Sequence, residues 1–418
     1  MMTDPGKKHD AYAVLKHRDF RLFISYRFFI TLAIQMQSLI VGWQMYELTK
    51  DPLALGLIGL AEAIPFISVA LYSGHVADRY NRKRIITWFS LLFLLGTLFL
   101  LAFSYDRLIA FMALGVLPIY FVVAITGFVR AFLYPSTIAL MAQLVPRYLY
   151  TNSSTWNSTV WHVAAISGPA IGGMIYGFFG VEVAYMIVIF FVMVALTLLF
   201  TVKHYPTPHV ELTETIWRRL GTGLRFVFKN QILLGTMSLD MLAVLFGGAV
   251  AMLPIFAAEI LFVGPQGLGF LRAAPMVGAV LMSLILAYRP PAANAGRWLL
   301  ISVAGFGLSI ICFAISKNFY LSLFLLFMSG VFDNVSVIIR ATTLQLLTPD
   351  EMRGRVASVN SIFIGSSNEI GSFESGLAAK IMGLIPSVIF GGSMTLLIVT
   401  AIAKKAPLLR RLNLRALK

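Results

Sequence analysis

The stretch GHVADRYNRKR, residues 74–84, separates two long apolar runs at 52–73 and 85–103. Each run is long enough to cross the hydrocarbon core of a bilayer as a helix, which takes about 20 residues. Positive side chains gather in the short cytoplasmic connections of membrane proteins. The stretch therefore predicts two membrane helices joined by a short basic segment. Its glycine and charged residues are Gly74, Asp78, Arg79, Arg82, Lys83 and Arg84.

The composition extends this interpretation to the whole chain. Of 418 residues, 59% are hydrophobic and only 12% are charged, and the mean hydropathy is +0.84. Soluble proteins carry about 25% charged residues, so a multi-pass membrane protein is expected. The net charge of +15 is spread over short connections and tails, which argues against nucleic-acid binding.

Several classes of enzyme and metalloprotein are disfavoured. The phosphate-binding Gly-x-x-x-x-Gly-Lys-Ser/Thr loop and the Gly-x-Ser-x-Gly nucleophile motif are both absent from the sequence. The single cysteine, Cys312, allows neither a disulfide framework nor a thiolate metal site. We expect no enzymatic activity, no metal and no cofactor.

Hydropathy predicts an all-α membrane protein with twelve transmembrane helices. The expected spans lie near 20–48, 53–77, 85–104, 108–145, 152–179, 182–202, 231–259, 266–288, 297–316, 319–347, 356–381 and 385–403. If the N-terminus is cytoplasmic, most of the 33 Lys and Arg residues lie on the cytoplasmic side. Both termini are therefore expected in the cytoplasm of a multi-pass protein of the bacterial inner membrane. The residues expected on the opposite side are Lys50, Arg107, Lys317 and Lys380.

The chain is expected to divide into two bundles of six helices, at 1–202 and 231–418. The connection between them, 203–230, interleaves charged and apolar residues and predicts an amphipathic helix on the membrane surface. A shift of 203 residues superposes Asn157 on Asn360 and Gly168 on Gly371, among several other matches without a gap. Such parallel repeats are typical of transporters built from two related bundles.

The order Gly74-x-x-x-Asp78-Arg79-x-x-Arg82-Lys83 resembles the signature between the second and third helices of the major facilitator superfamily, a group of secondary transporters. The resemblance implies two six-helix bundles around a central cavity. It also implies a gating role for this basic segment, in which Asp78 and the neighbouring arginines hold the cytoplasmic side closed in one state.

Two further stretches resemble the efflux branch of this superfamily, which includes macrolide and enterobactin exporters. They are the run 130–135, which begins with Arg130, and the run 374–376. The fifth predicted helix also resembles the glycine-proline motif of the superfamily's antiporters, which implies exchange against protons and closure of the outer side. A generic packing seam remains an alternative for these small residues. The motif residues are Gly168, Pro169, Gly172 and Gly173.

Ionisable groups inside the membrane are costly and are functional candidates. We expect Asp240 to carry the coupling proton, because its own helix offers no basic neighbour. Glu62 is the second choice, and the resemblance links Arg130 to proton transfer. Asp333 lies two turns before Arg340, so either this pair faces the central cavity or it is a structural ion pair.

The substrate is expected to be amphipathic. The first predicted helix offers neutral Gln35 and Gln37 beside methionine, and the fifth offers Trp161 and His162, although the histidine is equally consistent with packing. Arg340 and Glu369 are further cavity candidates.

The expected function is proton-coupled efflux of amphipathic organic compounds, drug-like or siderophore-like, by a monomer in the lipid bilayer. Two alternatives stay open: a lipid or lysolipid flippase, and a non-transporting receptor on the same fold.

Overall fold

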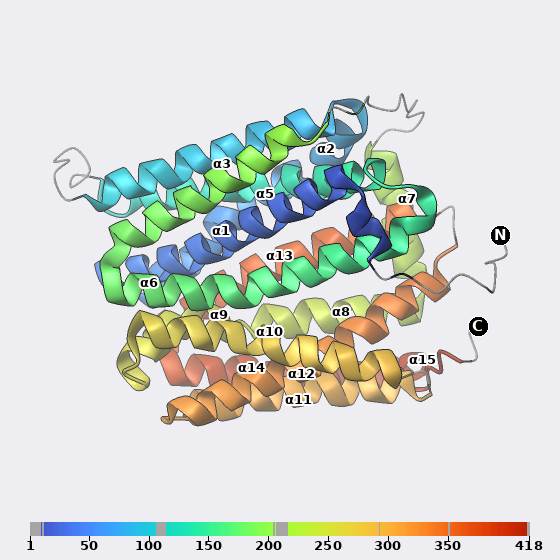
Figure 1. The fold of residues 1–418 in the computed structure, drawn as a ribbon. Coiled ribbons are helices and arrows are strands. Elements are labelled where there is room, and N and C mark those ends of the chain that lie inside the picture. Colours follow the sequence, from blue (N-terminus) through green and yellow to red (C-terminus); the bar gives the residue numbers. More distant parts are fainter. Residues whose placement is uncertain are drawn as a thin grey trace.

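The computed structural model describes residues 10, 12–105, 114–203, 205, 216–291, 293–349 and 352–415. These residues form long helices that run side by side along one axis, with both ends of the chain at the same end of the molecule (Figure 1). We call this the termini end and the opposite one the far end. The helices of the first half are α1 (Arg18–Thr49), α2 (Pro52–Arg79), α3 (Arg82–Ser104), α5 (Leu117–Gln143) and α6 (Tyr150–Thr201). Those of the second half are α8 (Gln231–Phe246), α9 (Ala249–Ile255), α10 (Gly264–Tyr288), α11 (Ala295–Ile315), α12 (Phe319–Leu347), α13 (Arg353–Met382) and α14 (Leu384–Lys405).

Ten helical segments of the described residues are long and apolar enough to cross a membrane. One of them contains α6, whose 52 residues change direction at Gly180, where φ is 88°. Only glycine adopts such a φ readily, so the fifth and sixth predicted spans meet here in a tight turn. Helix α13 lies among the others (Figure 1) but is more polar and is not one of the ten. The structure thus confirms an all-α membrane protein, and the count of twelve spans stays a prediction.

Two predicted spans differ from the helices found. The fourth, expected near 108–145, begins only at Leu117, because residues 114–116 form a turn and Pro118 occupies the first turn of α5. Proline is favoured at that position since its missing N–H has no partner there anyway; residues 108–113 lie outside the described part. The seventh, expected as one helix near 231–259, is broken at Gly247 and Gly248 into α8, α9 and a π-helical turn, Phe256–Ile260.

The connection between the halves contains a helix, α7 (Ile216–Lys229), as the amphipathic pattern predicts. Its described apolar side packs on the second half, where Val227 lies with Met237, Val356 and Val359. Residue 204 and residues 206–215 of the connection lie outside the described part of the chain.

The helices pack in two groups that touch along two seams. Within the first half α1 packs on α6 and α2 on α5; within the second half α10 and α11 pack on α12. The seams between the groups are α2 against α13 and α6 against α10. The interface between the two groups is therefore formed mainly by α2, α13, α6 and α10.

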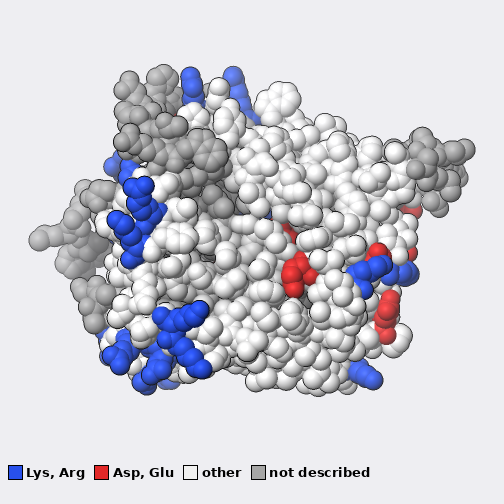
Figure 2. All heavy atoms as spheres, turned by 180° about the vertical axis from the view of Figure 1, so that it is seen from behind, with Lys and Arg blue, Asp and Glu red and all other residues white. Residues whose placement is uncertain are grey.

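Charge is distributed unevenly over the surface. Figure 2 shows the face opposite to that of Figure 1, with most Lys and Arg at the end that carries the termini and a broad band without them beside it. A band with so few charged side chains suits contact with lipid.

Candidate functional site

A cavity of about 800 Å³ lies between the first turns of α6 and the last turns of α10, at the termini end. Its α6 wall is rich in hydroxyl groups, whereas α10 adds mostly apolar side chains. No residue of the lining carries a permanent charge. The lining consists of Tyr150, Thr151, Ser154, Thr155, Ser158, Thr159, His162, Val163, Ile166, Val280, Ser283 and Leu284.

The far end is closed by helix backbones that touch. A Cβ atom placed on Gly56 of α2 would lie 2.9 Å from the Cα of Gly376 on α13. One placed on Gly173 of α6 would lie 2.4 Å from the carbonyl oxygen of Pro265 and 3.0 Å from the Cα of Gly269 on α10. Small residues permit such close approach between membrane helices.

Polar contacts join the two halves at the same far end. The Tyr46 hydroxyl donates to Glu259 Oε1 at 2.9 Å, and Lys380 Nζ lies 3.1 Å from Asp51 Oδ1. We call these two contacts the far-end lock. With the far end closed and the cavity at the other, the protein is in a state open toward the termini end.

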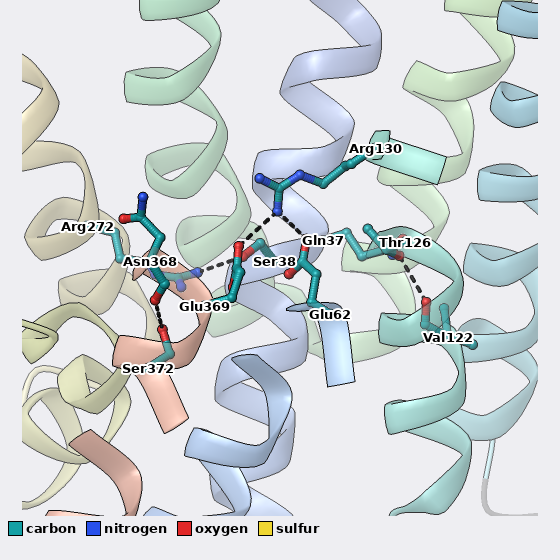
Figure 3. A network of polar contacts seen from close by, with 10 residues as sticks. All are labelled: Gln37, Ser38, Glu62, Val122, Thr126, Arg130, Arg272, Asn368, Glu369 and Ser372. Carbon is teal, nitrogen blue, oxygen red and sulfur yellow. Dashed lines mark hydrogen bonds and ion pairs between the residues drawn. The ribbon is translucent and has the colours of Figure 1, made fainter. Parts of the chain in front are cut away.

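Four charged side chains from four helices meet where the halves touch: Glu62 of α2, Arg130 of α5, Arg272 of α10 and Glu369 of α13. We call them the arginine–glutamate cluster. Arg130 Nη1 forms ion pairs with Glu62 Oε1 and, at 3.3 Å, with Glu369 Oε1, so it links the two halves (Figure 3).

The second arginine of the cluster, Arg272, donates to Ser38 Oγ of α1 at 3.3 Å and lies beside Glu369 (Figure 3). Two positive and two negative charges thus balance one another, which limits the cost of placing them between membrane helices. The Arg130 side chain is 43% exposed, although it is paired with carboxylates of both halves. It therefore faces an internal space that solvent can reach, while its partners Glu62 and Glu369 are 16% and 19% exposed.

The structure places the predicted polar wall of α1 differently from expectation. Gln37 is only 4% exposed and bonds Thr97 at 2.6 Å and Thr126 at 3.5 Å, so it holds α1 to α3 and α5 (Figure 3). Its assignment to the substrate cavity is wrong, because its amide is used inside the first half. Gln35 is half-buried against Gly168.

Of the two candidates on α6, His162 lines the cavity and Trp161 does not, although it is 38% exposed. His162 Nδ1 is buried and has no hydrogen-bond partner among the described residues. The glycine-proline motif that follows packs on both halves. Gly168 and Gly172 touch α1 at Leu32 and Met36, and Gly173 touches α10.

The expectation that Asp240 is a lone acid is wrong. It forms an ion pair with Arg340, and the two side chains are 8% and 13% exposed. The pair joins α8 to α12 inside the second half, so Arg340 is not a residue of the large cavity. An Asp333–Arg340 ion pair is not found in the described part of the chain, where Arg340 pairs with Asp240. Asp333 instead lines a small void together with Asp240.

The basic segment, residues 74–84, is mostly helical rather than a loop. Helix α2 continues through Asp78 to Arg79, and α3 begins at Arg82 after a two-residue turn. Asn81 caps α3 by accepting a hydrogen bond from the Arg84 backbone N–H, a common way to satisfy the free amides of a helix start.

Side chains of the basic segment bond residues of the first half and the start of the connection. Arg82 donates to the carbonyl oxygen of Ala139, and Lys83 donates to those of Phe200 and Val202. Asn81 donates to the carbonyl oxygen of Tyr205. Burial and a bond to Asp19 raise the pKa of the Tyr205 hydroxyl to about 12. In this state the segment therefore fastens α2, α3, α5 and the end of α6 to one another.

Sequence reasoning assigned no role to Arg272, Ser38 or the far-end lock. Arg272 has a signal that would have found it, since it is a charge within an apolar span. The lock residues lie at helix ends, where charged and aromatic side chains are common, and nothing local distinguishes them.

Comparisons with known proteins agree with this architecture. The profile of the family described as transmembrane secretion effector matches residues 9–415. The enterobactin exporter EntS of Shigella flexneri is 25% identical over 343 residues, which is 81% of this chain and 80% of that protein. EntS of Escherichia coli O81 (strain ED1a) is similar to the same extent.

Solved structures of transporters share the fold at low identity. A POT family transporter in complex with 5-aminolevulinic acid has a TM-score of 0.73 and 12% identity, covering 94% of this chain and 96% of that one. The bacterial homologue of the human lysosomal transporter Spinster, in an inward-facing and unoccupied conformation, has a TM-score of 0.71 and 14% identity, covering 98% and 99%. The fold is that of the major facilitator superfamily, the protein is a multi-pass membrane transporter rather than an enzyme, and the chain belongs to the transmembrane secretion effector family.

Proposed function

We propose that this protein exports an amphipathic organic compound across the bacterial inner membrane in exchange for entering protons. The observation that carries the proposal is Arg130, which is held between a glutamate of its own half and a glutamate of the other half. It lies where the halves touch, and a large uncharged cavity opens at one end of the same interface.

Coupling follows from competition for the same carboxylates. A proton bound to Glu62 or Glu369 removes a negative charge that holds Arg130. In this scheme bound substrate separates the halves at the far end, which breaks the Arg130–Glu369 pair and lets the freed carboxylate take up a proton from the outer side. When the far end closes again, Arg130 regains its partner and the proton leaves toward the termini end. Each proton that enters provides about 2.3 kcal/mol per 100 mV of membrane potential.

The orientation belongs to the same proposal. The end rich in Lys and Arg (Figure 2) is placed in the cytoplasm, because positive residues gather on that side. Both termini are then cytoplasmic and the structure is in its inward-open state. The two halves, 1–202 and 231–418 with a connection at 203–230, rock against each other in this scheme, and one copy of the chain suffices.

The substrate class rests on the cavity and on the relatives. The cavity combines hydroxyl groups with aliphatic side chains, which suits a molecule with a polar and an apolar side. The similarity to exporters of enterobactin makes a siderophore the first compound to test, followed by lipophilic drugs.

The test uses purified protein in proteoliposomes with a pH-sensitive dye inside. Substrate is loaded in the lumen or added outside, and proton and substrate fluxes are followed together for wild type, Glu62→Gln and Glu369→Gln. Glu182→Gln, at the far-end turn of α6 near Gly180, is the matched control. We expect substrate-dependent proton flux in wild type and the control, and a loss of more than tenfold in both cluster variants.

Substrate flux without proton flux in wild type would refute the coupling. Normal coupled flux in both cluster variants would refute the role of the cluster. Movement of lysolipids alone would favour the flippase alternative, and binding without any flux would favour the receptor.

A further inference from the structure

Arg27 is a charged residue of a membrane helix that the proposed coupling does not use. It lies about two and a half turns into α1, counted from the start of the helix at the termini end (Figure 1). A charge at such a position is costly unless another group compensates it. Arg130 and Arg340 have carboxylate partners, whereas no carboxylate of the described residues forms an ion pair with Arg27. Its positive charge is therefore uncompensated in this state.

The guanidinium of Arg27 is held at one nitrogen, while the other two are available. Nε donates to Oδ1 of Asn157 on α6 at 3.3 Å, which orients the group. Nη1 and Nη2 bond no side chain or carbonyl group of the described residues, and neither is sealed from solvent. Together these two nitrogens carry four N–H groups. They therefore offer hydrogen-bond donors to an open space.

This open space lies between the two halves. Ser38 follows Arg27 on α1 by about three turns, so the two residues lie on the same face of the helix. Ser38 accepts a hydrogen bond from Arg272 of the second half, so this face of α1 is turned toward the interface. On α6, Ser158 follows Asn157 directly and lines the large cavity. Arg27 thus lies at the edge of that cavity.

The surroundings of Arg27 favour a ligand of negative charge. The positive and negative side chains of the arginine–glutamate cluster balance one another, and the lining of the cavity carries no permanent charge. A bound anion would compensate Arg27, whereas a bound cation would be repelled by it. The Nη1 and Nη2 groups also present N–H bonds side by side, a geometry that binds a carboxylate or a phosphate through two hydrogen bonds.

We infer that Arg27 binds an oxyanion of the exported compound, such as a carboxylate or a phosphate, while the apolar part of the compound occupies the cavity between α6 and α10. Asn157 orients the guanidinium for this contact. The inference deepens the proposed export function, because it names the polar end of the amphipathic substrate, and it rests on that function.

The test measures equilibrium binding, which requires no transport. The probes are a fluorescent alkyl carboxylate and the corresponding carboxamide and trimethylammonium compounds, which share one apolar tail and differ in the charge of the head group. Purified protein in nanodiscs of phosphatidylcholine, which adds no net charge, is titrated with each probe, and fluorescence anisotropy reports binding. The comparison of the three probes in the wild type needs no substitution.

Three substitutions change the guanidinium or its neighbour. Arg27→Gln removes the charge, and Arg27→Lys keeps the charge without the pair of N–H groups. Asn157→Asp keeps Arg27 and the shape of its neighbour, but it gives Arg27 a carboxylate partner of its own. The matched control is Arg21→Gln, which removes an exposed arginine from a different side of the same helix. The control changes the net charge of the protein as Arg27→Gln does.

We expect the wild type to bind the carboxylate about tenfold more tightly than the carboxamide, because hydrogen bonds to charged groups are the stronger ones. The trimethylammonium compound should bind weakest. Arg27→Gln and Asn157→Asp should remove the preference for the carboxylate and change carboxamide binding by less than about twofold. Arg27→Lys should retain part of the preference, and Arg21→Gln should retain all of it.

Equal binding of the carboxylate and the carboxamide by the wild type would overturn the inference. A preference that survives in Arg27→Gln, or that disappears equally in Arg21→Gln, would do the same. Loss of all three probes in Arg27→Gln would assign the residue to packing and would also overturn it. If a carboxylate preference depends on Arg27 while proton-coupled flux is absent, the proposed function fails and Arg27 stands as an anion-binding residue.

Discussion

At the scale of single residues, burial decides what each charge does. The Asp240–Arg340 pair lies within the second half and both side chains are almost fully enclosed. Breaking such a pair by removing one partner leaves an uncompensated charge, which costs about 3–5 kcal/mol. The cluster around Arg130 differs, because Arg130 faces a space that solvent reaches. We therefore assign a structural role to the Asp240–Arg340 pair and propose proton coupling for the arginine–glutamate cluster.

The structural role of Arg340 gives a stability prediction. Arg340→Met should lower the stability of the folded protein by about 3–5 kcal/mol, seen as a clear drop in the thermal unfolding temperature in detergent. Replacing Asp240 by leucine as well should restore much of the loss, because no charge is then left unpaired. The control is Arg297→Met, which removes an exposed arginine of α11. An unfolding temperature of Arg340→Met equal to that of the control would contradict the prediction.

At the scale of helices, glycines set how closely the two halves approach. Gly173 lies at the contact of α6 with α10, where even a Cβ atom would collide with backbone atoms. We predict that Gly173→Ala opens the far end and reduces transport several-fold, with folding retained. Gly221→Ala on α7, whose added Cβ meets nothing within 4 Å, is the control. Accessibility of cysteines introduced at the far end to an impermeant maleimide reports the opening. Unchanged labelling would show that the α6–α10 contact accommodates the alanine without opening the far end.

The turn between α2 and α3 gives a second prediction at this scale. Asp78 lies in the last turn of α2, and its charge acts on Arg82 at the start of α3. In a state closed at the termini end, these groups are expected to face the second half. Asp78→Asn should therefore reduce transport, with unfolding temperature and expression unchanged, because the affected contacts form in the other state. A variant that transports at the wild-type rate would remove Asp78 from gating.

At the scale of the whole molecule, the far-end lock biases the equilibrium between two open states. Its members are the Tyr46–Glu259 bond and the Asp51–Lys380 ion pair. The exposed Asp51–Lys380 pair contributes about 0.2–1 kcal/mol, and the hydrogen bond of the buried Tyr46 hydroxyl about 1 kcal/mol, so losing both changes the ratio of states several-fold. Tyr46→Phe combined with Lys380→Met should therefore increase the population open at the far end.

Labelling measures that population directly. In a background of Cys312→Ala, which removes the single native cysteine, a cysteine at Ser158 lies in the cavity wall. An impermeant maleimide added on the cytoplasmic side should label it quickly, and more slowly when the lock is removed. A cysteine at Ser153, which is buried, should stay unlabelled throughout. Equal labelling rates at position 158 with and without the lock would show that the lock does not set the equilibrium.

The sequence predicted correctly those features that depend on residues close together in the chain. Apolar runs of about 20 residues and the alternation of charge predicted the helices, because a membrane helix must satisfy its backbone and its lipid contacts within its own length. Gly180 and the turn at Asn81 lie close to the predicted helix ends. The same argument selected Glu62 and Glu369 as functional candidates, since each is an ionisable group in an apolar span. Arg130 was selected by its resemblance to the intramembrane arginine of the superfamily.

Only the tertiary structure decided which helix supplies the partner of each buried polar side chain. Arg130 meets Glu369, 239 residues away, and Asp240 meets Arg340, whereas reasoning along one helix had left Asp240 alone. Gln37 is likewise used inside the first half by residues of α3 and α5. The physical reason is that hydropathy fixes which segments enter the membrane. Packing then fixes their rotation and neighbours, and a buried charge or amide is satisfied by whichever helix that packing brings to it.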